Sequence, residues 1–175
     1  MEAGDKKLLI SLCAGKGTRL RPLTDHTAKA MIKIHGIPIL ENQIRLIKDY
    51  VAHNIVIGGY LFDTLYYGAG EKLLNKQFAT TNMVASLMCA QDYFEDYDEY
   101  IISYGDIIFN QRVIEELAAI SSDFSVVVDL AWLEYWKSRS DNPLLDAESL
   151  QIRGGLITDI GNKVDSATDI QGQFI

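Results

Sequence analysis

Short, continuous apolar runs alternate with segments of helical periodicity through the first 130 residues of this chain. The runs at 8–13, 55–57, 100–103 and 124–130 have the length of buried strands, and glycine follows the first three within two residues. Strands that are apolar throughout are typical of parallel sheets covered on both faces. This alternation predicts an α/β fold with a mixed, mostly parallel sheet.

Segments of helical spacing lie between these runs. Pro38 suits the first position of a helix, and the apolar side chains after it recur at helical spacing as far as Val51. Helical patterns also cover residues 62–74, 83–92 and 113–120. We therefore expect helices to connect the predicted strands.

The composition is that of an ordinary globular protein, with 48% hydrophobic and 23% charged residues in 175. These values exclude a disordered chain, a collagen-like chain and a coiled coil, and the length predicts one domain over residues 1–175. No apolar run approaches the roughly 20 residues of a membrane span. The charged residues 1–7 and the short apolar segment after them run into Gly15, Lys16 and Gly17 where a signal peptide would have its cleavage site. We expect a cytoplasmic protein.

The formal net charge is −8, and it is unevenly distributed. Residues 1–50 carry nine Lys and Arg against five Asp and Glu. An acidic chain is a poor match for nucleic acid, which needs an extended basic surface. A local cluster of basic side chains suits a small polyanion such as a nucleoside triphosphate, and a solvated basic loop is the alternative. The cluster consists of Lys16, Arg19, Arg21, Lys29 and Lys33.

A glycine-bearing turn follows the first predicted strand, at the end where α/β sheets bind ligands. Gly15 and Gly17 would let the backbone approach a phosphate or a base closely. A P-loop requires a glycine where Ile10 stands, and a dinucleotide-binding turn requires one where Leu20 stands. Both of those glycine loops therefore fit this segment worse.

The extended segment resembles the signature of nucleotidyltransferases that join a nucleoside triphosphate to a phosphorylated small molecule. Ala28 departs from this signature, which usually has proline before the lysine. The resemblance implies a three-layer, Rossmann-like α/β/α fold. The matching residues are Leu12, Ala14, Gly15, Gly17, Thr18, Arg19, Leu20, Pro22, Thr24 and Lys29.

Five further segments are similar to the cytidylyltransferases that act on phosphocholine or 2-aminoethylphosphonate, the phosphonate branch being slightly closer. The resemblance implies transfer of CMP from CTP to such an acceptor, with release of pyrophosphate. A sugar-1-phosphate nucleotidyltransferase and a non-catalytic nucleotide-binding module stay open as alternatives. No nucleic-acid or membrane partner is expected, and the oligomeric state is left open, a homo-oligomer included. The segments are residues 80–87, 103–106, 129–132, 135–139 and 142–148.

The same resemblance assigns roles around the phosphates. It implies that Asp106 binds Mg²⁺, although an aspartate at a strand end can also serve a turn or a helix cap. Lys29 would stabilise charge on the transferring phosphorus, while Lys16 and Arg19 would hold the β- and γ-phosphates. The nucleotide-binding residues would be Leu12, Ala14, Gly15, Gly17, Thr18, Asn82 and Ser86.

Two of these expectations have a structural alternative. The backbone of Ala14 and Gly15, together with Asn82 or Ser86, would contact the cytosine edge. Asn82 would alternatively cap the following helix, and the two roles are compatible. Asp129, Trp132 and Trp136 would bind a cationic acceptor group by a carboxylate and cation–π contacts. An aromatic pair four residues apart more often packs into a core.

The chain ends in what resembles the middle of the family pattern, at residues 172–175. The resemblance implies a continuation that carries a second metal-binding aspartate, which has no counterpart in this sequence. We therefore expect a nucleotidyltransferase domain that lacks the family's C-terminal part.

Overall fold

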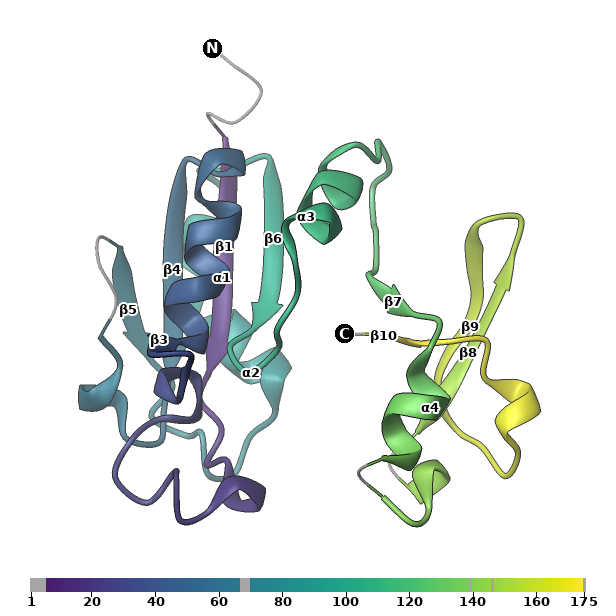
Figure 1. Cartoon of the computed structure of the whole chain (residues 1–175). Helices are drawn as coiled ribbons and strands as arrows, with labels where there is room; N and C mark the ends of the chain where they lie inside the picture. Colours follow the sequence, from purple (N-terminus) through teal and green to yellow (C-terminus); the bar gives the residue numbers. More distant parts are fainter. Residues whose placement is uncertain (1–5, 67–69, 139, 146, 175) are drawn as a thin grey trace. The chain divides into compact units, whose positions relative to one another are not determined.

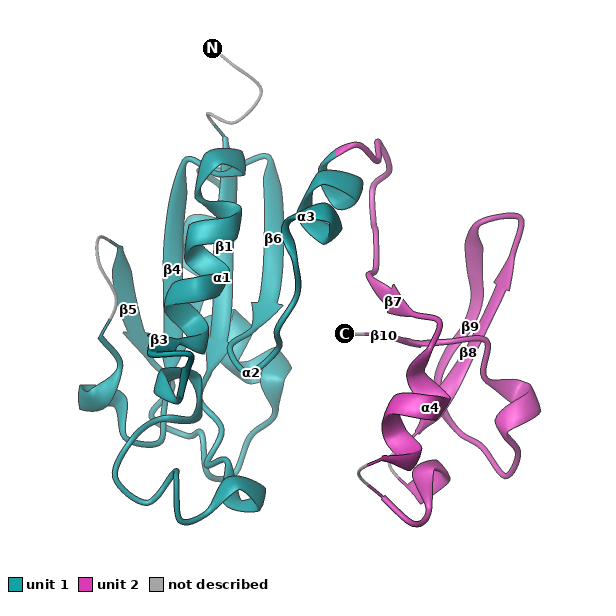
Figure 2. Cartoon of the chain, in the orientation of Figure 1, with its two compact units in different colours: residues 1–118 teal, residues 119–175 magenta. Residues whose placement is uncertain are grey.

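The computed structural model describes residues 6–66, 70–138, 140–145 and 147–174 (Figure 1). The chain divides into two compact units, Met1–Ala118 and Ala119–Ile175, which Figure 2 colours separately. The expectation of a single domain over the whole chain stays a prediction.

A four-stranded parallel sheet forms the centre of the first unit. The strand order is β5-β4-β1-β6, so β1 lies between β4 and β6. Leu8 of β1 pairs with His53 of β4 and with Tyr100 of β6. This sheet confirms the predicted α/β fold with mostly parallel strands. The strands are β1 (Lys7–Cys13), β4 (His53–Gly58), β5 (Glu71–Leu74) and β6 (Glu99–Tyr104).

Side chains of β1 alternate between two hydrophobic clusters, as the period of a strand requires. Leu8 and Ile10 pack in the cluster that contains Ala90, beyond α2 (Met83–Leu87). Leu9 packs instead in the cluster that contains residues of α1 (Ile39–Ile47) and α3 (Gln111–Ala118). Both faces of the sheet are therefore covered, and helix α1 is seen against one of them in Figure 1.

Shorter elements connect these strands and helices. Pro38 ends β3 and immediately precedes α1. The helix therefore begins one residue later than the sequence predicted, at Ile39 and not at Pro38. The predicted helix over 83–92 is divided into α2 and a 3₁₀ helix. The short elements are β2 (Lys33–Ile34), β3 (Ile37–Pro38) and 3₁₀ helices at Thr18–Leu20, Lys29–Met31, Lys48–Tyr50, Phe62–Thr64 and Met88–Tyr93.

The predicted helix over residues 62–74 is wrong. A 3₁₀ turn at Phe62–Thr64 begins this stretch and strand β5 ends it, with residues 67–69 outside the described part. The apolar side chains with helical spacing serve different clusters. Leu65 packs beside α1, whereas Leu73 packs in the cluster on the other face of the sheet. A single helix could not place them on both faces.

The second unit contains α4 (Trp132–Lys137) and the hairpin of β8 (Glu148–Arg153) and β9 (Leu156–Lys163). The predicted strand over 124–130 is reduced to β7 (Val128–Asp129), which pairs antiparallel with β10 (Gln173–Phe174). Phe124 is 84% exposed, so the apolar run lacks the burial that a central strand requires. The 3₁₀ helices Pro143–Leu145 and Ala167–Asp169 complete the unit. Among the described residues, no helix has both the length and the apolar character needed to span a membrane.

Candidate functional site

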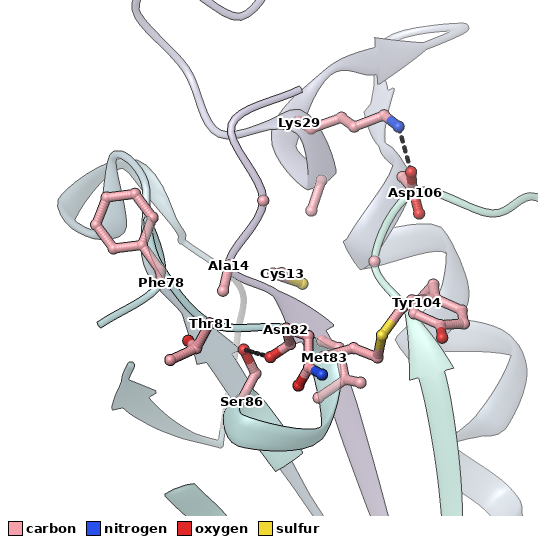
Figure 3. A pocket seen from close by; sticks show the side chains of 14 residues that line it. Cys13, Ala14, Lys29, Phe78, Thr81, Asn82, Met83, Ser86, Tyr104 and Asp106 are labelled. Carbon is pink, nitrogen blue, oxygen red and sulfur yellow. Dashed lines mark hydrogen bonds and ion pairs between the residues drawn. The ribbon is translucent and has the colours of Figure 1, made fainter. Parts of the chain in front are cut away.

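A cavity of about 230 Å³ lies in the first unit, at the carboxyl ends of β1 and β6 (Figure 3). This is the place where the strand order changes direction, because β4 and β6 flank β1 on opposite sides. Ligands of open α/β sheets bind at such positions. The lining residues are Leu12, Cys13, Ala14, Gly15, Lys29, Ala30, Phe78, Thr81, Asn82, Met83, Ser86, Tyr104, Gly105 and Asp106.

Lys29 and Asp106 form an ion pair that lines this cavity. Lys29 begins the 3₁₀ helix Lys29–Met31, and Asp106 follows the end of β6, as Figure 3 shows. Their side chains are 28% and 35% exposed. A pair with this much exposure contributes only about 0–1 kcal/mol to stability. The arrangement holds a cation and a carboxylate within reach of a ligand.

The backbone before Lys29 is fixed by an unexpected contact. Ala28 stands where the family signature has proline, and its φ of −61° is the angle that proline would impose. Its backbone N–H donates to Thr64 Oγ1 at 2.9 Å, and Thr64 in turn donates to the carbonyl of Leu61 at 2.8 Å. Proline lacks this N–H, so a hydrogen bond replaces the ring in fixing the approach to Lys29.

Gly17 closes the turn after β1 in the left-handed region, with φ of 61°. A Cβ at this position would lie 3.0 Å from Thr24 Cγ2 and 3.1 Å from Lys29 Cβ. The hydroxyl of Thr24 donates to the Gly17 carbonyl at 2.9 Å, which holds the turn in place. The glycine therefore allows the turn to pack against the base of the lysine side chain.

Cys13 and Gly105 are packed together beneath Asp106. A Cβ on Gly105 would lie 2.2 Å from Cys13 Sγ, so a larger residue does not fit without movement. Burial, with a smaller contribution from the charge of Asp106, raises the pKa of the Cys13 thiol to about 12. The thiol is therefore neutral at physiological pH and is not a nucleophile.

Gln43 of α1 supports the segment that carries Asp106. Its Nε2 donates to the carbonyl of Tyr104 at 2.9 Å and to the carbonyl of Ile107 at 2.7 Å, on either side of that aspartate. Gln43 is 1% exposed although it lies on a helix whose other buried residues are apolar. A buried amide is retained at low cost when its hydrogen bonds are satisfied.

On the opposite side of the cavity, Thr81, Asn82 and Ser86 line it, and Asn75 lies behind them. We call these four polar side chains the amide wall. Asn82 caps α2, because its Oδ1 accepts from the backbone N–H of Val84 at 3.1 Å and of Ala85 at 3.2 Å. This cap confirms the structural alternative for Asn82, which also lines the cavity. Asn75 is 5% exposed and donates to the hydroxyls of Thr81 and Ser86.

The structure brings together seven of the predicted site residues in this cavity. Lys16 and Arg19 lie instead on the exposed part of the turn after β1, and Gly17 and Thr18 belong to the same turn without lining the cavity. The seven are Leu12, Ala14, Gly15, Lys29, Asn82, Ser86 and Asp106.

The predicted acceptor-binding residues belong to the second unit. Trp132 is 3% exposed and packs in a cluster with Ala147 and Ile170, as the core alternative predicted. The ring of Trp136 meets it edge to face, with centroids 5.7 Å apart. Asp129 accepts a hydrogen bond from the backbone N–H two residues later at 2.8 Å. Their role in acceptor binding stays a prediction.

Several lining residues were missed from the sequence. Phe78 belongs to no motif that the sequence analysis identified. Its place is reflected at Gly59, where a Cβ would lie 2.5 Å from Phe78 Cβ, so this position has no room for a larger residue. Thr81 and Tyr104 lie inside segments that carry the family resemblance, but a resemblance over a segment does not identify which side chains face a cavity.

A parallel α/β sheet with a glycine-bearing turn, a lysine and a carboxylate at its carboxyl ends is an architecture of nucleotide-binding proteins. The sequence matches the family of MobA-like NTP transferase domains over residues 9–150, and the chain belongs to that family. This match confirms the resemblance to nucleotidyltransferases that the glycine-bearing segment predicted.

Individual relatives extend this comparison. A CTP:phosphoglutamine cytidylyltransferase of Campylobacter jejuni is 35% identical over 176 residues, covering 95% of this chain and 70% of that protein. A choline-phosphate cytidylyltransferase of Haemophilus influenzae is 30% identical over 149 residues, covering 81% of this chain and 63% of that protein. The CTP:phosphocholine cytidylyltransferase structure of Streptococcus pneumoniae shares the fold, with a TM-score of 0.61 and 22% identity over 97% of this chain and 66% of that one. The chain thus spans between 63% and 70% of the length of these three proteins.

Proposed function

We propose that this protein transfers a CMP group from CTP to a small acceptor that carries a phosphate or phosphonate, with release of pyrophosphate. The observation that carries the proposal is the placement of Lys29 and Asp106 in one cavity with Ala14 and Gly15 of the glycine-bearing turn. The similarity to cytidylyltransferases with phosphoglutamine and choline-phosphate in their names supports the nucleotide and the class of acceptor.

The chemistry needs charge neutralisation more than a general base. A phosphate or phosphonate oxygen of the acceptor is already anionic, so it can attack the α-phosphorus of CTP without losing a proton. The bond between the α-phosphorus and the oxygen that bridges to the β-phosphate breaks, and pyrophosphate leaves with its electron pair. The ammonium group of Lys29 would stabilise the negative charge on the α-phosphate. Lys16 and Arg19, on the exposed turn, would bind the β- and γ-phosphates.

The residues of the cavity fit a Mg²⁺ ion. Magnesium in nucleotide sites is bound by one or two carboxylates together with phosphate oxygens and water. Asp106 is the acidic residue among those described as lining the cavity, and it would supply the protein ligand. Within the described ranges, no three His, Cys, Asp or Glu side chains converge on a metal site of their own. When bound, the ion would neutralise phosphate charge as pyrophosphate departs.

The acceptor would carry a cationic or amide nitrogen, as choline phosphate and 2-aminoethylphosphonate do. Asp129 and Trp136 are the side chains that we propose for this group. Trp132, which is buried, would support Trp136 through their edge-to-face contact.

The experiment is a pyrophosphate-release assay with CTP and Mg²⁺. The acceptor panel contains phosphoglutamine, phosphocholine, 2-aminoethylphosphonate and glucose 1-phosphate. We expect turnover with one of the first three acceptors and little with the sugar phosphate. Preference for glucose 1-phosphate would instead assign a sugar-1-phosphate nucleotidyltransferase. Binding of CTP without pyrophosphate release for any acceptor would assign a non-catalytic nucleotide-binding module.

A further inference from the structure

Two side-chain amides of the amide wall have their orientation fixed by backbone donors. Asn75 Oδ1 accepts from the backbone N–H of Gln77 at 2.9 Å, and Asn82 Oδ1 accepts from two N–H groups at the start of α2. A backbone N–H can only donate, so the oxygen of each amide must face it. The amino group of each asparagine therefore points to the other side.

The amino group of Asn75 determines which atoms the two hydroxyls of the wall offer. It donates to Thr81 Oγ1 at 3.1 Å and to Ser86 Oγ at 3.0 Å. Each hydroxyl has one proton, and each directs it to a carbonyl of its own segment. Thr81 donates to Gln77 O at 2.8 Å, and Ser86 donates to Asn82 O at 3.5 Å, the contact drawn in Figure 3. What remains on both oxygens is a lone pair, so each hydroxyl acts as an acceptor.

We propose that Asn75, through Thr81 and Ser86, makes this wall select an amino-pyrimidine over a keto-pyrimidine. The 4-amino group of cytosine is a donor, whereas uracil and thymine present a 4-keto acceptor at the same position. An acceptor facing the hydroxyl lone pairs is left without a hydrogen bond and repelled. The Asn82 amino group beside them is a donor that suits the acceptor atoms of the cytosine edge. This inference rests on the proposed function, because it gives the reason for the choice of CTP.

Asn75 is therefore a positioning residue and not a catalytic one. It is 5% exposed and lines no part of the cavity itself, and Ser86 is 4% exposed. The comparison that isolates its effect is CTP against UTP, because these differ at the pyrimidine edge alone. ATP also presents an amino group, but on a larger ring.

The test measures dissociation constants for CTP and for UTP by titration calorimetry, without acceptor, on the full chain. We expect CTP to bind about 10- to 100-fold more tightly than UTP. Thr81→Val keeps the shape of the side chain and removes the acceptor. It should reduce the preference for CTP, measured as the dissociation constant of UTP divided by that of CTP, about fivefold. Thr80→Val is the matched control, since Thr80 donates to the same Gln77 carbonyl at 3.3 Å without lining the cavity. It should leave the ratio unchanged.

Asn75→Leu is the second variant, with its folding checked by circular dichroism. If Asn75 only stabilised the fold, its replacement would weaken the binding of CTP and UTP equally. We expect instead that the preference for CTP over UTP falls. Equal affinities of the unaltered protein for CTP and UTP would overturn the inference, as would an unchanged ratio in Thr81→Val. Selective CTP binding without pyrophosphate release in any assay would refute the proposed function and leave this inference standing.

Discussion

Lys29 and Asp106, 77 positions apart in the sequence, are joined by an ion pair at the carboxyl ends of β1 and β6. Both side chains are about one-third exposed, so the pair adds little to stability. We propose that its consequence is functional, because the fold places opposite charges beside the glycine-bearing turn, where the phosphates of a bound nucleotide would lie.

Asp106→Asn should abolish most turnover while leaving the fold intact. The amide keeps the shape of the side chain but loses the charge for a metal ion and for Lys29, so kcat should fall at least about 100-fold. The free energy of unfolding should change by less than about 1 kcal/mol. Pyrophosphate release and urea unfolding measure the two effects. Asp98→Asn, which removes an exposed ion pair with Lys6, is the control. A near-normal rate in Asp106→Asn would exclude the proposed metal role.

Gln43→Met should affect both stability and turnover. Methionine fills a similar volume but leaves the carbonyls of Tyr104 and Ile107 without their buried donor, at a cost of about 1–3 kcal/mol. Because these carbonyls flank Asp106, kcat should fall more than CTP affinity. Ser103→Ala is a suitable control, since it removes a 3.4 Å bond to Gln43 Oε1 and leaves both Nε2 bonds. Equal effects of the two variants on kcat would argue against positioning by Gln43.

Ala28→Pro should destabilise the protein, although it restores the residue that the family signature has. The backbone angle suits proline, but the ring replaces an N–H that lies 2.9 Å from Thr64 Oγ1. We expect a loss of about 1–3 kcal/mol in the free energy of unfolding. Thr64→Ala removes the other partner, so Ala28→Pro should cost less in that background. Urea unfolding of the four proteins gives the coupling, and strictly additive losses would contradict the prediction.

Cys13 should make the protein less stable at alkaline pH. Its pKa is raised from an ordinary 9.0 to about 12, chiefly by burial. Between these pH values the unfolded chain releases a proton that the folded chain keeps, so the free energy of unfolding falls by up to about 1.4 kcal/mol per pH unit. Below pH 9 this contribution is complete, and it is lost as the pH rises towards 12.

The measurement for this prediction is denaturant unfolding between pH 8.5 and roughly 11, compared with Cys13→Ala. The difference between the two proteins should shrink as the pH rises. Tyr93, whose pKa its hydrogen bond to Glu71 also raises to about 12, contributes equally to both proteins. Parallel pH profiles would show that the Cys13 thiol does not control this slope.

The sequence pattern alone could predict those strands and helices whose apolar side chains are all buried in the way that the pattern suggests. Residues 8–13 are apolar except for Ser11 because β1 is covered on both faces, and the pattern shows this directly. The helical spacing in residues 62–74 led to a wrong prediction because Leu65 and Leu73 are buried on different faces of the sheet. Only the tertiary structure decides which face each side chain covers.

The same distinction applies to the cavity. The glycine-bearing turn and Lys29 lie in one continuous motif, and Asp106 closely follows a recognisable strand, so these could be predicted. Gln43 and Asn75 belong to no motif. Gln43 acts on carbonyls 61 and 64 positions away, and Asn75 on a hydroxyl of the helix that follows. Such hydrogen-bond partners become known only when the elements are packed.

The order of strands has a consequence for synthesis on the ribosome. The turn after β1 and Lys29 are synthesised early. Asp106, which pairs with Lys29, follows β6, and β6 lies on the side of β1 opposite to β4. A nascent chain that has released only β1, β4 and β5 exposes the flank of β1 that β6 will cover. This apolar flank is the kind of surface that chaperones recognise during synthesis, and the cavity lined by Lys29 and Asp106 is incomplete until β6 is in place.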